Sequence, residues 1–465
     1  MPKRMIAAIL SLFLTTVSLA QLHLAQLQNS KSRNLKRIDG STITPAEIDR
    51  AVTRLMRTAD VTGIAIAILN DGQVAYLKAY GVRDKEKKLA LTPNSVMYAA
   101  SFTKVAFAYM VMQLVDEGVL DLDKPVYQYL PKALPEYDDY KDLANDQRYQ
   151  RITARMLLSH TSGFPNWRRL TDDGKLSINF EPGSRFAYSG EGIALLQLVV
   201  ESATKKPLDA LMRDRVFQPL GMTRSSMVWE DRFESDYANG YDEQEHSLGP
   251  QKLTRADAAG SMQTTLTDFG HFMEAVMQGK GLRQETREQM LSSQIPILSK
   301  HEFPTLSTET TGENKAIRLS YGLGWGLYWT PYGKAFFKEG HLEGWRHDVV
   351  CFDKPGTGIV IMTNSSKRRK PLQSTPRNLA QQYLHTDRVG RVHAIQFSEV
   401  RRPLPGLRDA KSGGNHCRRN RWRCNPSHEA RKVPLPAETR LAVSGALQNP
   451  GFRSWCSFTT QTTKP

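Results

Sequence analysis

Apolar and polar residues follow two different periods along this chain. Residues 63–80, GIAIAILNDGQVAYLKAY, hold two β-rich stretches on either side of Asn-Asp-Gly. A turn sequence of this kind between strand-like stretches is a strong signal for a β-hairpin. Strand character returns only after residue 320, in the stretches LGWGLYW, AFFKEG, DVVCFD and GIVIMTNS.

Helical periods occupy the middle of the sequence. The apolar run over 101–117 predicts a helix that Gly118 closes. Between about 120 and 260 the helical patterns are short and are interrupted by Pro and Gly, and a longer one follows over 267–277. The middle of the chain is therefore expected to be mostly helical.

Strand-like stretches thus lie on both sides of a helical middle. One antiparallel sheet built from both chain ends, flanked by helices and carrying an inserted helical part, accounts for this order. We predict an α+β fold, with one domain over residues 45–388 and the helical insertion at about 120–260. A cleft is expected between the two parts.

The N-terminus, MPKRMIAAILSLFLTTVSLAQ, places two basic residues before a short apolar stretch that ends in Ser-Leu-Ala. This order is typical of a cleaved signal peptide, residues 1–20, and predicts a periplasmic or secreted protein; a retained anchor is the alternative. No membrane span is expected in the mature chain. Residues 21–44 are polar and basic and are predicted to form a flexible leader, up to Thr44, which with Glu47 indicates a helix cap.

The net charge of +16 is concentrated at the chain ends. Residues 391–465 carry 14 Lys and Arg against 4 Asp and Glu, and residues 1–40 have a net charge of +5, which leaves about +1 for 41–390. A near-neutral centre argues against a nucleic-acid-binding fold. Pro, Gly and Arg without periodicity predict a basic disordered tail over 389–465, either simply solvated or in contact with an anionic surface.

Cysteine usage adds little chemistry. Only one of the four cysteines, Cys351, lies in the predicted domain, and a core of this size does not need disulfides. A zinc site can be drawn in the tail from His416, Cys417, Cys424 and His428. Its spacing matches no common zinc pattern, so no metal and no cofactor are predicted.

Ser101 and Lys104 are spaced to lie on one face of the predicted helix, one turn apart. A serine hydroxyl needs a base at neutral pH, and a lysine becomes one when burial lowers the pKa of its amine. The pair is therefore a candidate nucleophile and base, although a serine at a helix start is also an ordinary N-cap. The same spacing occurs at Ser202 and Lys205, where the following Lys and Pro predict an exposed helix end.

Two further segments offer groups for the same site. Lys338-Glu339-Gly340 ends an apolar run that is expected to be an edge strand facing the cleft, and its glycine would let a substrate backbone approach. Tyr188, in the Gly-rich turn of EPGSRFAYSGEG, supplies a phenol that can relay protons.

Taken in order, five segments make the chain resemble the serine β-lactamase and penicillin-binding-protein superfamily, in particular its class C β-lactamase-like branch, which also holds esterases and peptidases. The segments are Ser101-Phe-Thr-Lys104, LLSHTSGF at 157–164, PGSRFAYSG at 182–190, Lys338-Glu-Gly340 with Gly344-Trp345, and GIVIMTNS at 358–365. The resemblance covers about residues 45–385.

The resemblance implies a catalytic set. Ser101 would attack a carbonyl and become acylated, and Lys104 would take its proton. Tyr188 would share that proton network, protonate the leaving group and activate the deacylating water. Lys338 would tune the network and steer an anionic substrate, while the backbone N–H groups of Ser101 and His341 would form an oxyanion hole.

Further residues are predicted to contact substrate, and they join Lys338 in this role: Gly340, His341, Phe164 and Trp345. Trp167 and Trp325 are additional candidates for the pocket wall, although aromatic side chains more often serve packing. His160, in LLSHTSGF, is interpreted as a structural loop residue.

Two positions depart from the family pattern. Gly190 stands where Tyr-x-Asn has an asparagine that would bind an acylamino group; a literal Tyr-x-Asn at 237–239 lacks the PGSRF context and stays open as the alternative. Glu339 replaces a small hydroxyl residue and would repel carboxylates, unless it points away or pairs with Lys338 or Arg346. Both changes favour ester or amide substrates without a demanding anionic group.

We therefore expect an exported serine hydrolase that forms an acyl-enzyme with ester or amide substrates, β-lactam or peptide-like. The expected partner is a small-molecule or peptide-like substrate, not a nucleic acid, and the oligomeric state stays open. The alternatives are a non-catalytic penicillin-binding-like sensor on the same scaffold and a protein that acts at an envelope surface through its basic tail.

Overall fold

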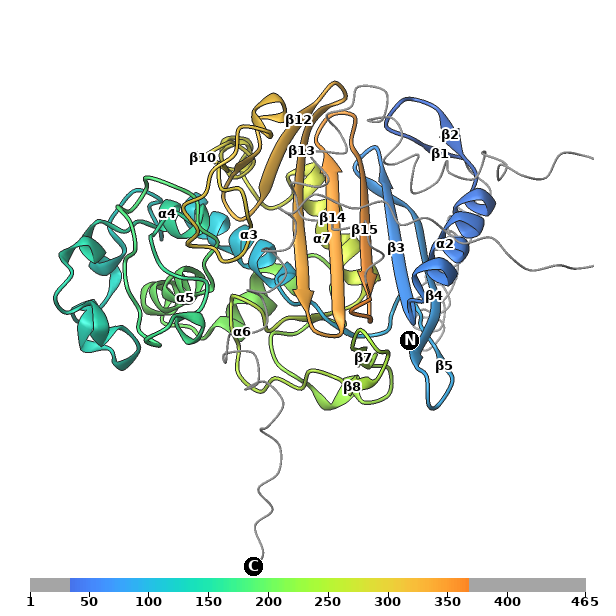
Figure 1. Cartoon of the computed structure of the whole chain (residues 1–465), viewed down its shortest axis with the longest axis horizontal. Coiled ribbons are helices and arrows are strands. Elements are labelled where there is room, and N and C mark those ends of the chain that lie inside the picture. Colours follow the sequence, from blue (N-terminus) through green and yellow to red (C-terminus); the bar gives the residue numbers. More distant parts are fainter. Residues whose placement is uncertain (1–33, 368–465) are drawn as a thin grey trace, which may run out of the picture. The chain divides into compact units, whose positions relative to one another are not determined.

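The computed structural model describes residues 34–367 (Figure 1). The predicted signal peptide (1–20), the tail (389–465) and the zinc alternative lie outside the described residues, as does most of the predicted leader. Among the described residues, nine strands form one antiparallel sheet in the order β10-β11-β12-β13-β14-β15-β3-β4-β5. Their bounds are β3 Gly63–Asn70, β4 Gln73–Asp84, β5 Leu89–Ala90, β10 Ile295–Pro296, β11 Ser320–Tyr321, β12 Gly326–Thr330, β13 Gly333–Leu342, β14 Trp345–Phe352 and β15 Thr357–Thr363.

The sheet joins strands from distant parts of the sequence, because β15 pairs with β3. The predicted α+β fold, with one sheet built from both sides of a helical middle, is confirmed. The helices flank this sheet or belong to the middle part: α2 Pro45–Ala59, α3 Phe102–Asp116, α4 Ala154–Leu158, α5 Gly190–Thr204, α6 Leu208–Met212, the π-helix η6 Arg213–Phe217, α7 Leu266–Gln278 and α8 Gln284–Met290. Short 3-10 helices and the small strands β7 Gly240–Tyr241 and β8 Ser247–Gly249 complete the middle part, and β6 Met97–Tyr98 pairs with β9 Gln263–Thr264.

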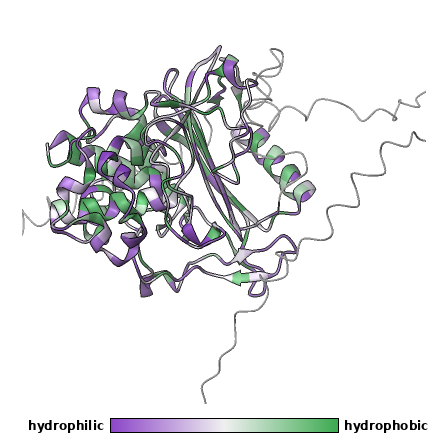
Figure 2. Cartoon of the chain, turned by 60° about the vertical axis from the view of Figure 1, so that its left-hand side comes forward, coloured by the Kyte–Doolittle hydropathy of each residue, from purple (hydrophilic) through white to green (hydrophobic). Residues whose placement is uncertain are grey.

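Side-chain alternation in β3 places the sheet between two apolar layers. Ala65, Ala67 and Leu69 face the large core that also contains α3 and α7, whereas Ile66 and Ile68 face a smaller cluster with residues of α2. Figure 2 shows the sheet between α2 and the helical part. A strand buried on both faces reads as a continuous apolar run, as β3 does in the sequence.

Local signals in the sequence correspond to the observed turns and caps. Asp71 and Gly72 adopt left-handed φ values of 53° and 72° between β3 and β4, as a tight hairpin turn requires. Thr44 and Glu47 form the predicted capping box at the start of α2. The helix predicted over 101–117 is α3, and Gly118 beyond its end has φ 72°.

The expectation of a flexible leader is wrong for residues 34–44. Strands β1 (Leu35–Lys36) and β2 (Thr42–Ile43) form a small antiparallel hairpin there. Leu35 and Ile43 are buried in the cluster that α2 makes with the sheet, so apolar residues set within a polar segment are enough to fix it.

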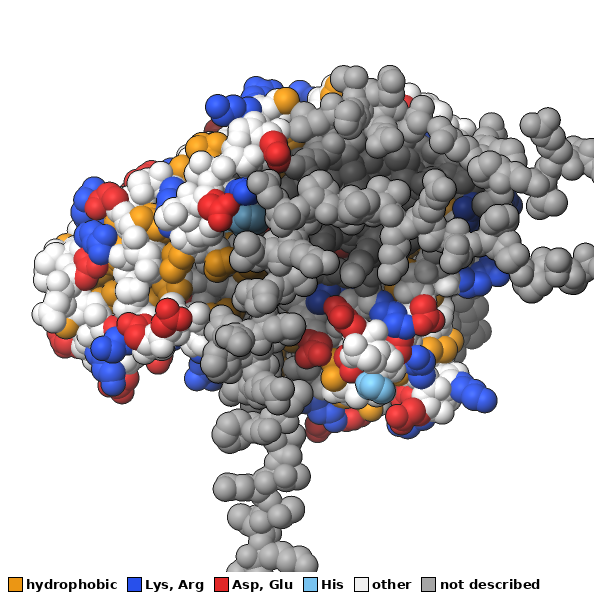
Figure 3. All heavy atoms as spheres, in the orientation of Figure 1, with side chains coloured by type: hydrophobic (Ala, Val, Ile, Leu, Met, Phe, Trp, Pro, Cys, Tyr) orange, Lys and Arg blue, Asp and Glu red, His pale blue; other side chains and the backbone are white. Residues whose placement is uncertain are grey.

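Exposed charges on the helical part are mixed in sign. Figure 3 shows Lys and Arg side chains interspersed with Asp and Glu on the visible face of this part. None of the helices between residues 34 and 367 is long and apolar enough to span a bilayer.

Candidate active site

Ser101 and Lys104 lie at the start of α3, where the helix meets the sheet. Lys104 Nζ donates a hydrogen bond of 3.2 Å to Ser101 Oγ and one of 2.5 Å to the carbonyl oxygen of Ala259. Lys104 is only 2% exposed, whereas Ser101 is half-buried. The Ser101 side chain makes no capping hydrogen bond to the helix, so it does not serve as an ordinary N-cap.

The backbone that precedes Ser101 has an unusual conformation. Ala100 has a left-handed φ of 48°. Residues other than glycine adopt such a φ only at an energetic cost. Thr103 holds this turn, because its Oγ1 donates to the Ala100 carbonyl at 2.6 Å and accepts from the Met262 N–H at 3.1 Å. The surrounding structure therefore fixes the position of Ser101.

Tyr188 lies close to both lysines of the site. The centre of its ring is 5.1 Å from Lys104 Nζ and 4.9 Å from Lys338 Nζ. Its hydroxyl is buried and interacts with Ser101 and Lys104 without meeting hydrogen-bond geometry to either. Burial alone would raise the pKa of Tyr188, but the charges of Lys104 and Lys338 outweigh burial and lower the pKa. The phenolate is thereby favoured.

The two lysines titrate in opposite directions. Burial lowers the pKa of Lys104; the charge of Tyr188 opposes burial, and the neighbouring Lys338 ammonium acts with it, so the pKa stays lowered. Burial also acts to lower the pKa of Lys338, but the Tyr188 phenolate and, after it, Tyr321 and the Glu339 carboxylate outweigh burial and raise the pKa. Lys104 therefore has the character of a base, and Lys338 that of a permanent cation.

Strand β13 has an open edge where the site requires one. Its pairing with β12 ends at Phe337, so residues 338–342 pair with β14 alone. The Asp353 N–H donates to the Lys334 carbonyl, so the backbone polar groups of Lys334 face β14. The direction of these groups alternates from one residue to the next along a strand. His341 is an odd number of residues from Lys334, so its N–H points away from β14, to the open edge. The prediction of an edge strand at 338–340 holds for this end of β13, although β13 as a whole is an interior strand.

Glu339 resolves one of the alternatives left open by the sequence. Its carboxylate Oε2 lies 3.4 Å from Lys338 Nζ, and the two side chains are 13% and 3% exposed. The substituted carboxylate thus pairs with the lysine beside it, and it offsets part of the positive charge of the site.

Three of the residues predicted to bind substrate have other roles. A Cβ on Gly340 would lie 2.7 Å from the Ala99 carbonyl and 3.1 Å from the Phe102 ring, so this glycine admits the start of α3 rather than a substrate. Phe164 and Trp345 are completely buried in the main core, as is Trp325. They pack in the core rather than line a pocket, and the sequence did not show how deeply they are buried. His341 is still a candidate, with a side chain 23% exposed.

His160 supports Tyr188 from behind. The two ring centres are 4.4 Å apart, and His160 Nδ1 accepts a hydrogen bond from the Ser189 N–H at 3.2 Å. Burial, followed by the charges of Lys104 and Lys338, holds the pKa of His160 well below its usual value. The imidazole is therefore buried and packed, as expected of a structural loop residue.

The alternative Tyr-x-Asn and Ser-x-x-Lys sequences lie outside the site. Tyr237 packs on Trp229, with ring centres 5.7 Å apart, and near Lys252, so of the two tyrosines only Tyr188 contacts the lysines of the site. Lys205 is the exposed, left-handed cap at the end of α5, as predicted from the residues that follow it.

Two groups were not identified from the sequence: the one that holds Lys104, and the one that holds strand β6 before Ser101. The Ala259 carbonyl is a backbone acceptor and leaves no signal in residue types; Asp257 fixes its turn by accepting the Ala259 N–H at 2.7 Å. His347, completely buried, lies with Nε2 2.8 Å from the Tyr98 carbonyl. The one signal in the sequence for this contact is a histidine within an apolar strand next to the site.

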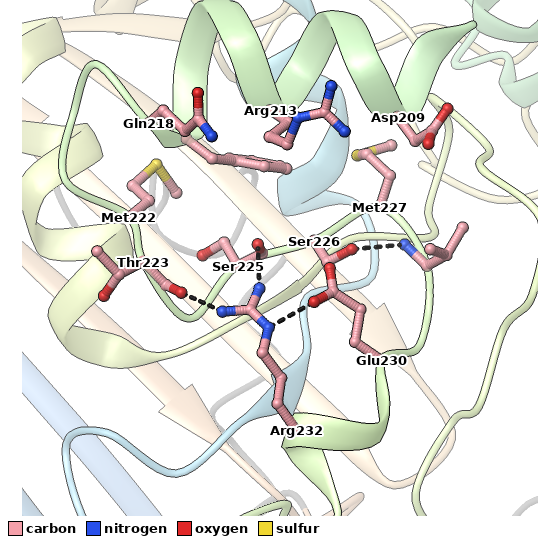
Figure 4. Close-up of a pocket in the computed structure, with 12 residues that line it drawn as sticks. Asp209, Arg213, Gln218, Met222, Thr223, Ser225, Ser226, Met227, Glu230 and Arg232 are labelled. Atoms are coloured by element: carbon pink, nitrogen blue, oxygen red, sulfur yellow. Dashed lines mark hydrogen bonds and ion pairs between the residues drawn. The ribbon is translucent and has the colours of Figure 1, made fainter.

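A cavity of about 340 Å³ lies in the helical part, between η6 and the loop before Arg232 (Figure 4). Its lining does not include any of the catalytic candidates. Arg232 crosses it and bonds to Glu230 and to the carbonyls of Thr223 and Ser225, so its charge is already paired. Among residues 34–367, no group of three His, Cys, Asp or Glu side chains is placed to hold a metal ion.

The fold and this site define a member of the serine β-lactamase and penicillin-binding-protein superfamily. The sequence profile of the family described as Beta-lactamase matches residues 48–384. The chain therefore belongs to the Beta-lactamase family.

Relatives and solved structures are similar at low identity. Protein flp of Staphylococcus aureus (strain N315) is 23% identical over 347 residues, which cover 70% of this chain and 64% of that protein, so the chain spans less than two thirds of this relative. The Beta-lactamase of Pseudomonas fluorescens is 25% identical over 299 residues, which cover 61% of this chain and 74% of that protein.

Two solved structures share the fold. One is the octameric penicillin-binding protein homologue from Pyrococcus abyssi, with a TM-score of 0.57, 23% identity, and coverage of 70% of this chain and 74% of that chain. The other is D-alanine carboxypeptidase AmpC from Burkholderia cenocepacia, with a TM-score of 0.58, 20% identity, and coverage of 75% and 98%.

Proposed function

We propose that the protein is an exported serine hydrolase that forms an acyl-enzyme on Ser101, with Lys104 and Tyr188 as its proton relay. The observation that carries the proposal is the 3.2 Å contact between the buried Lys104 amine and the hydroxyl of the half-buried Ser101. A base at hydrogen-bond distance from a hydroxyl is the arrangement that nucleophilic catalysis needs. The N-terminal order of two basic residues before a short apolar stretch, typical of a signal peptide, supports export to the periplasm or medium.

The acylation step follows from the geometry. Ser101 Oγ forms a bond to the substrate carbonyl carbon, and its proton passes to the neutral Lys104 amine. Lys104 then passes this proton to the Tyr188 phenolate beside it, and Tyr188 delivers it to the leaving group as the carbon–oxygen or carbon–nitrogen bond breaks. In deacylation the same pair removes a proton from water, and the Ser101 hydroxyl is restored.

Two backbone N–H groups are available for the oxyanion. Ser101 precedes the first residue of α3, so its N–H has no intrahelical acceptor. The His341 N–H faces the open edge of β13, as the strand register requires. A preorganised donor of this kind contributes roughly 3 kcal/mol to transition-state stabilisation.

The substrate class is limited by charge. Lys338 is paired with Glu339, so a substrate carboxylate meets less positive charge than a free lysine would offer. We infer that the preferred substrates are small or peptide-like esters and amides that lack an essential carboxylate, and that β-lactams are a secondary class. The pairing also favours the second candidate function, a binding protein that does not turn over its ligand.

A fluorophosphonate probe with mass spectrometry tests the proposal. We expect one label per chain on Ser101, and we expect Ser101→Ala to lose both the label and the hydrolysis of p-nitrophenyl esters. The matched control is Ser202→Ala, which removes the serine of the second S-x-x-K sequence and should retain both. If the protein is not labelled and binds esters without hydrolysing them, the second candidate function, a binding protein, is correct instead.

A further inference from the structure

The segment 165–170 is fastened to the first turn of α5, directly after Tyr188. The Asn166 carbonyl accepts hydrogen bonds from the N–H groups of Gly190 and Glu191, at 2.9 and 3.0 Å. Arg168 donates to both carboxylate oxygens of Glu191, at 3.1 and 2.7 Å. Backbone and ion-pair contacts together therefore fix the position of the residue between them, Trp167.

Trp167 fills the space beside Gly190. A Cβ built on Gly190 would lie 2.6, 2.7 and 2.8 Å from three atoms of the indole ring. No side chain at position 190 fits while Trp167 stays in place, and no side-chain amide projects from this position into the site. The ring is only partly buried, so it also presents an apolar surface outward.

Arg169 stacks on this surface. Its guanidinium lies 4.8 Å from the centre of the Trp167 ring, and its charge acts on the Tyr98 hydroxyl, three residues before Ser101 in the chain. Arg169 has no carboxylate partner in the part of the chain that the structure describes. Trp167 thus lies against Gly190, two residues after Tyr188, and the arginine that stacks on it acts on a residue close to Ser101 in the chain.

Building on the hydrolase function proposed above, we propose that Trp167 is the wall of the acyl-group subsite and selects apolar acyl groups. An alkyl or arylalkyl chain next to the scissile carbonyl gains contact with the indole when it leaves water. An amide at the same place would lose its water and find no side-chain amide at position 190 to bond with. Within the substrate class proposed above, esters of apolar carboxylic acids are therefore preferred, and acylamino acids are discriminated against.

Two esters of equal chain length test this selection: p-nitrophenyl pentanoate and p-nitrophenyl N-acetylglycinate, in which an amide replaces the middle of the chain. We expect the intact protein to prefer the pentanoate by about tenfold or more in kcat/KM, because a buried unpaired amide is costly. Trp167→Ala should reduce this preference severalfold, and Trp167→Phe, which keeps an aromatic wall, should retain most of it.

The matched control is Trp329→Ala. Trp329 also stacks with an arginine, Arg318, at 4.7 Å, but it belongs to β12 and should leave the preference unchanged. A preference that is the same in Trp167→Ala and the intact protein, with Ser101-dependent hydrolysis present in both, overturns the acyl-subsite inference alone. Absence of Ser101-dependent hydrolysis from the intact protein overturns the proposed function, and the subsite with it.

Discussion

The ammonium of Lys338 lies 4.9 Å from the centre of the Tyr188 ring, where the lysine and the tyrosine hydroxyl are both buried. At this distance and depth, a positive charge stabilises a phenolate strongly, because solvent screens it little. Together with the Lys104 charge, which acts more strongly, the Lys338 charge explains why the pKa of Tyr188 is lowered although burial alone would raise it. It also connects strand β13 to the proton chemistry of α3.

The first prediction concerns the pH dependence of activity. Lys104 and Tyr188 must each be deprotonated to accept a proton, so kcat/KM should fall as the pH drops through their lowered pKa values. The Lys338 charge contributes to lowering both values. Lys338→Met should therefore move the acid limb of the kcat/KM profile to higher pH, by about one unit or more, as expected for the loss of a close buried charge.

Lys338→Arg serves as the control for this profile, because it keeps the charge and should leave the acid limb near its original position. The measurement is kcat/KM for a neutral ester between pH 5 and pH 10, with thermal melting to verify folding. An acid limb that stays in place or moves to lower pH in Lys338→Met would contradict the assigned role of the charge.

The second prediction separates the two tyrosines that the sequence left in competition. Tyr188→Phe should lower kcat by roughly 10²–10⁴-fold, because it removes a group that transfers protons in the transition state. Tyr237→Phe should leave kcat nearly unchanged, since Tyr237 packs on Trp229. Equal losses in the two variants, or a loss in Tyr237→Phe alone, would show that the wrong tyrosine has been assigned.

Local sequence signals predicted the strands and helices that carry the site. The Asn-Asp-Gly turn, the apolar runs of β13 to β15 and the closing glycine after α3 each act over a few residues, so they can be interpreted without the rest of the chain. The same is true of Ser101 and Lys104, because i, i+3 spacing on a helix fixes their common face.

Features that depend on packing between distant segments were not predictable. Gly340 reads as a substrate contact in isolation, and only the approach of Ala99 and Phe102 shows its actual role. Phe164 and Trp345 carry no mark of burial depth, and the Ala259 carbonyl that holds Lys104 is a backbone group. Residues 34–44 were misjudged because two or three apolar residues are too few for a periodic pattern.

The third prediction follows from the packing of Gly340. Gly340→Ala would bring a Cβ to 2.7 Å from the Ala99 carbonyl, so the turn before Ser101 must shift. A displacement of this kind near the nucleophile should lower kcat by about 10²-fold. Leu342→Ala, on the same strand but exposed, is the control and should retain activity. Unaltered turnover in a folded Gly340→Ala protein would contradict this role.

The fourth prediction concerns the charge of the substrate. Glu339 lies 3.4 Å from Lys338, so Glu339→Thr should free the ammonium to bind a substrate carboxylate. We expect kcat/KM for the p-nitrophenyl monoester of glutaric acid to rise about tenfold relative to p-nitrophenyl pentanoate, since a bond to a charged group contributes about 1.5 kcal/mol or more. Glu343→Thr removes the same charge from the exposed hairpin loop and controls for long-range effects. If both variants change the ratio equally, or neither does, the Lys338–Glu339 pair does not set the charge preference of the site.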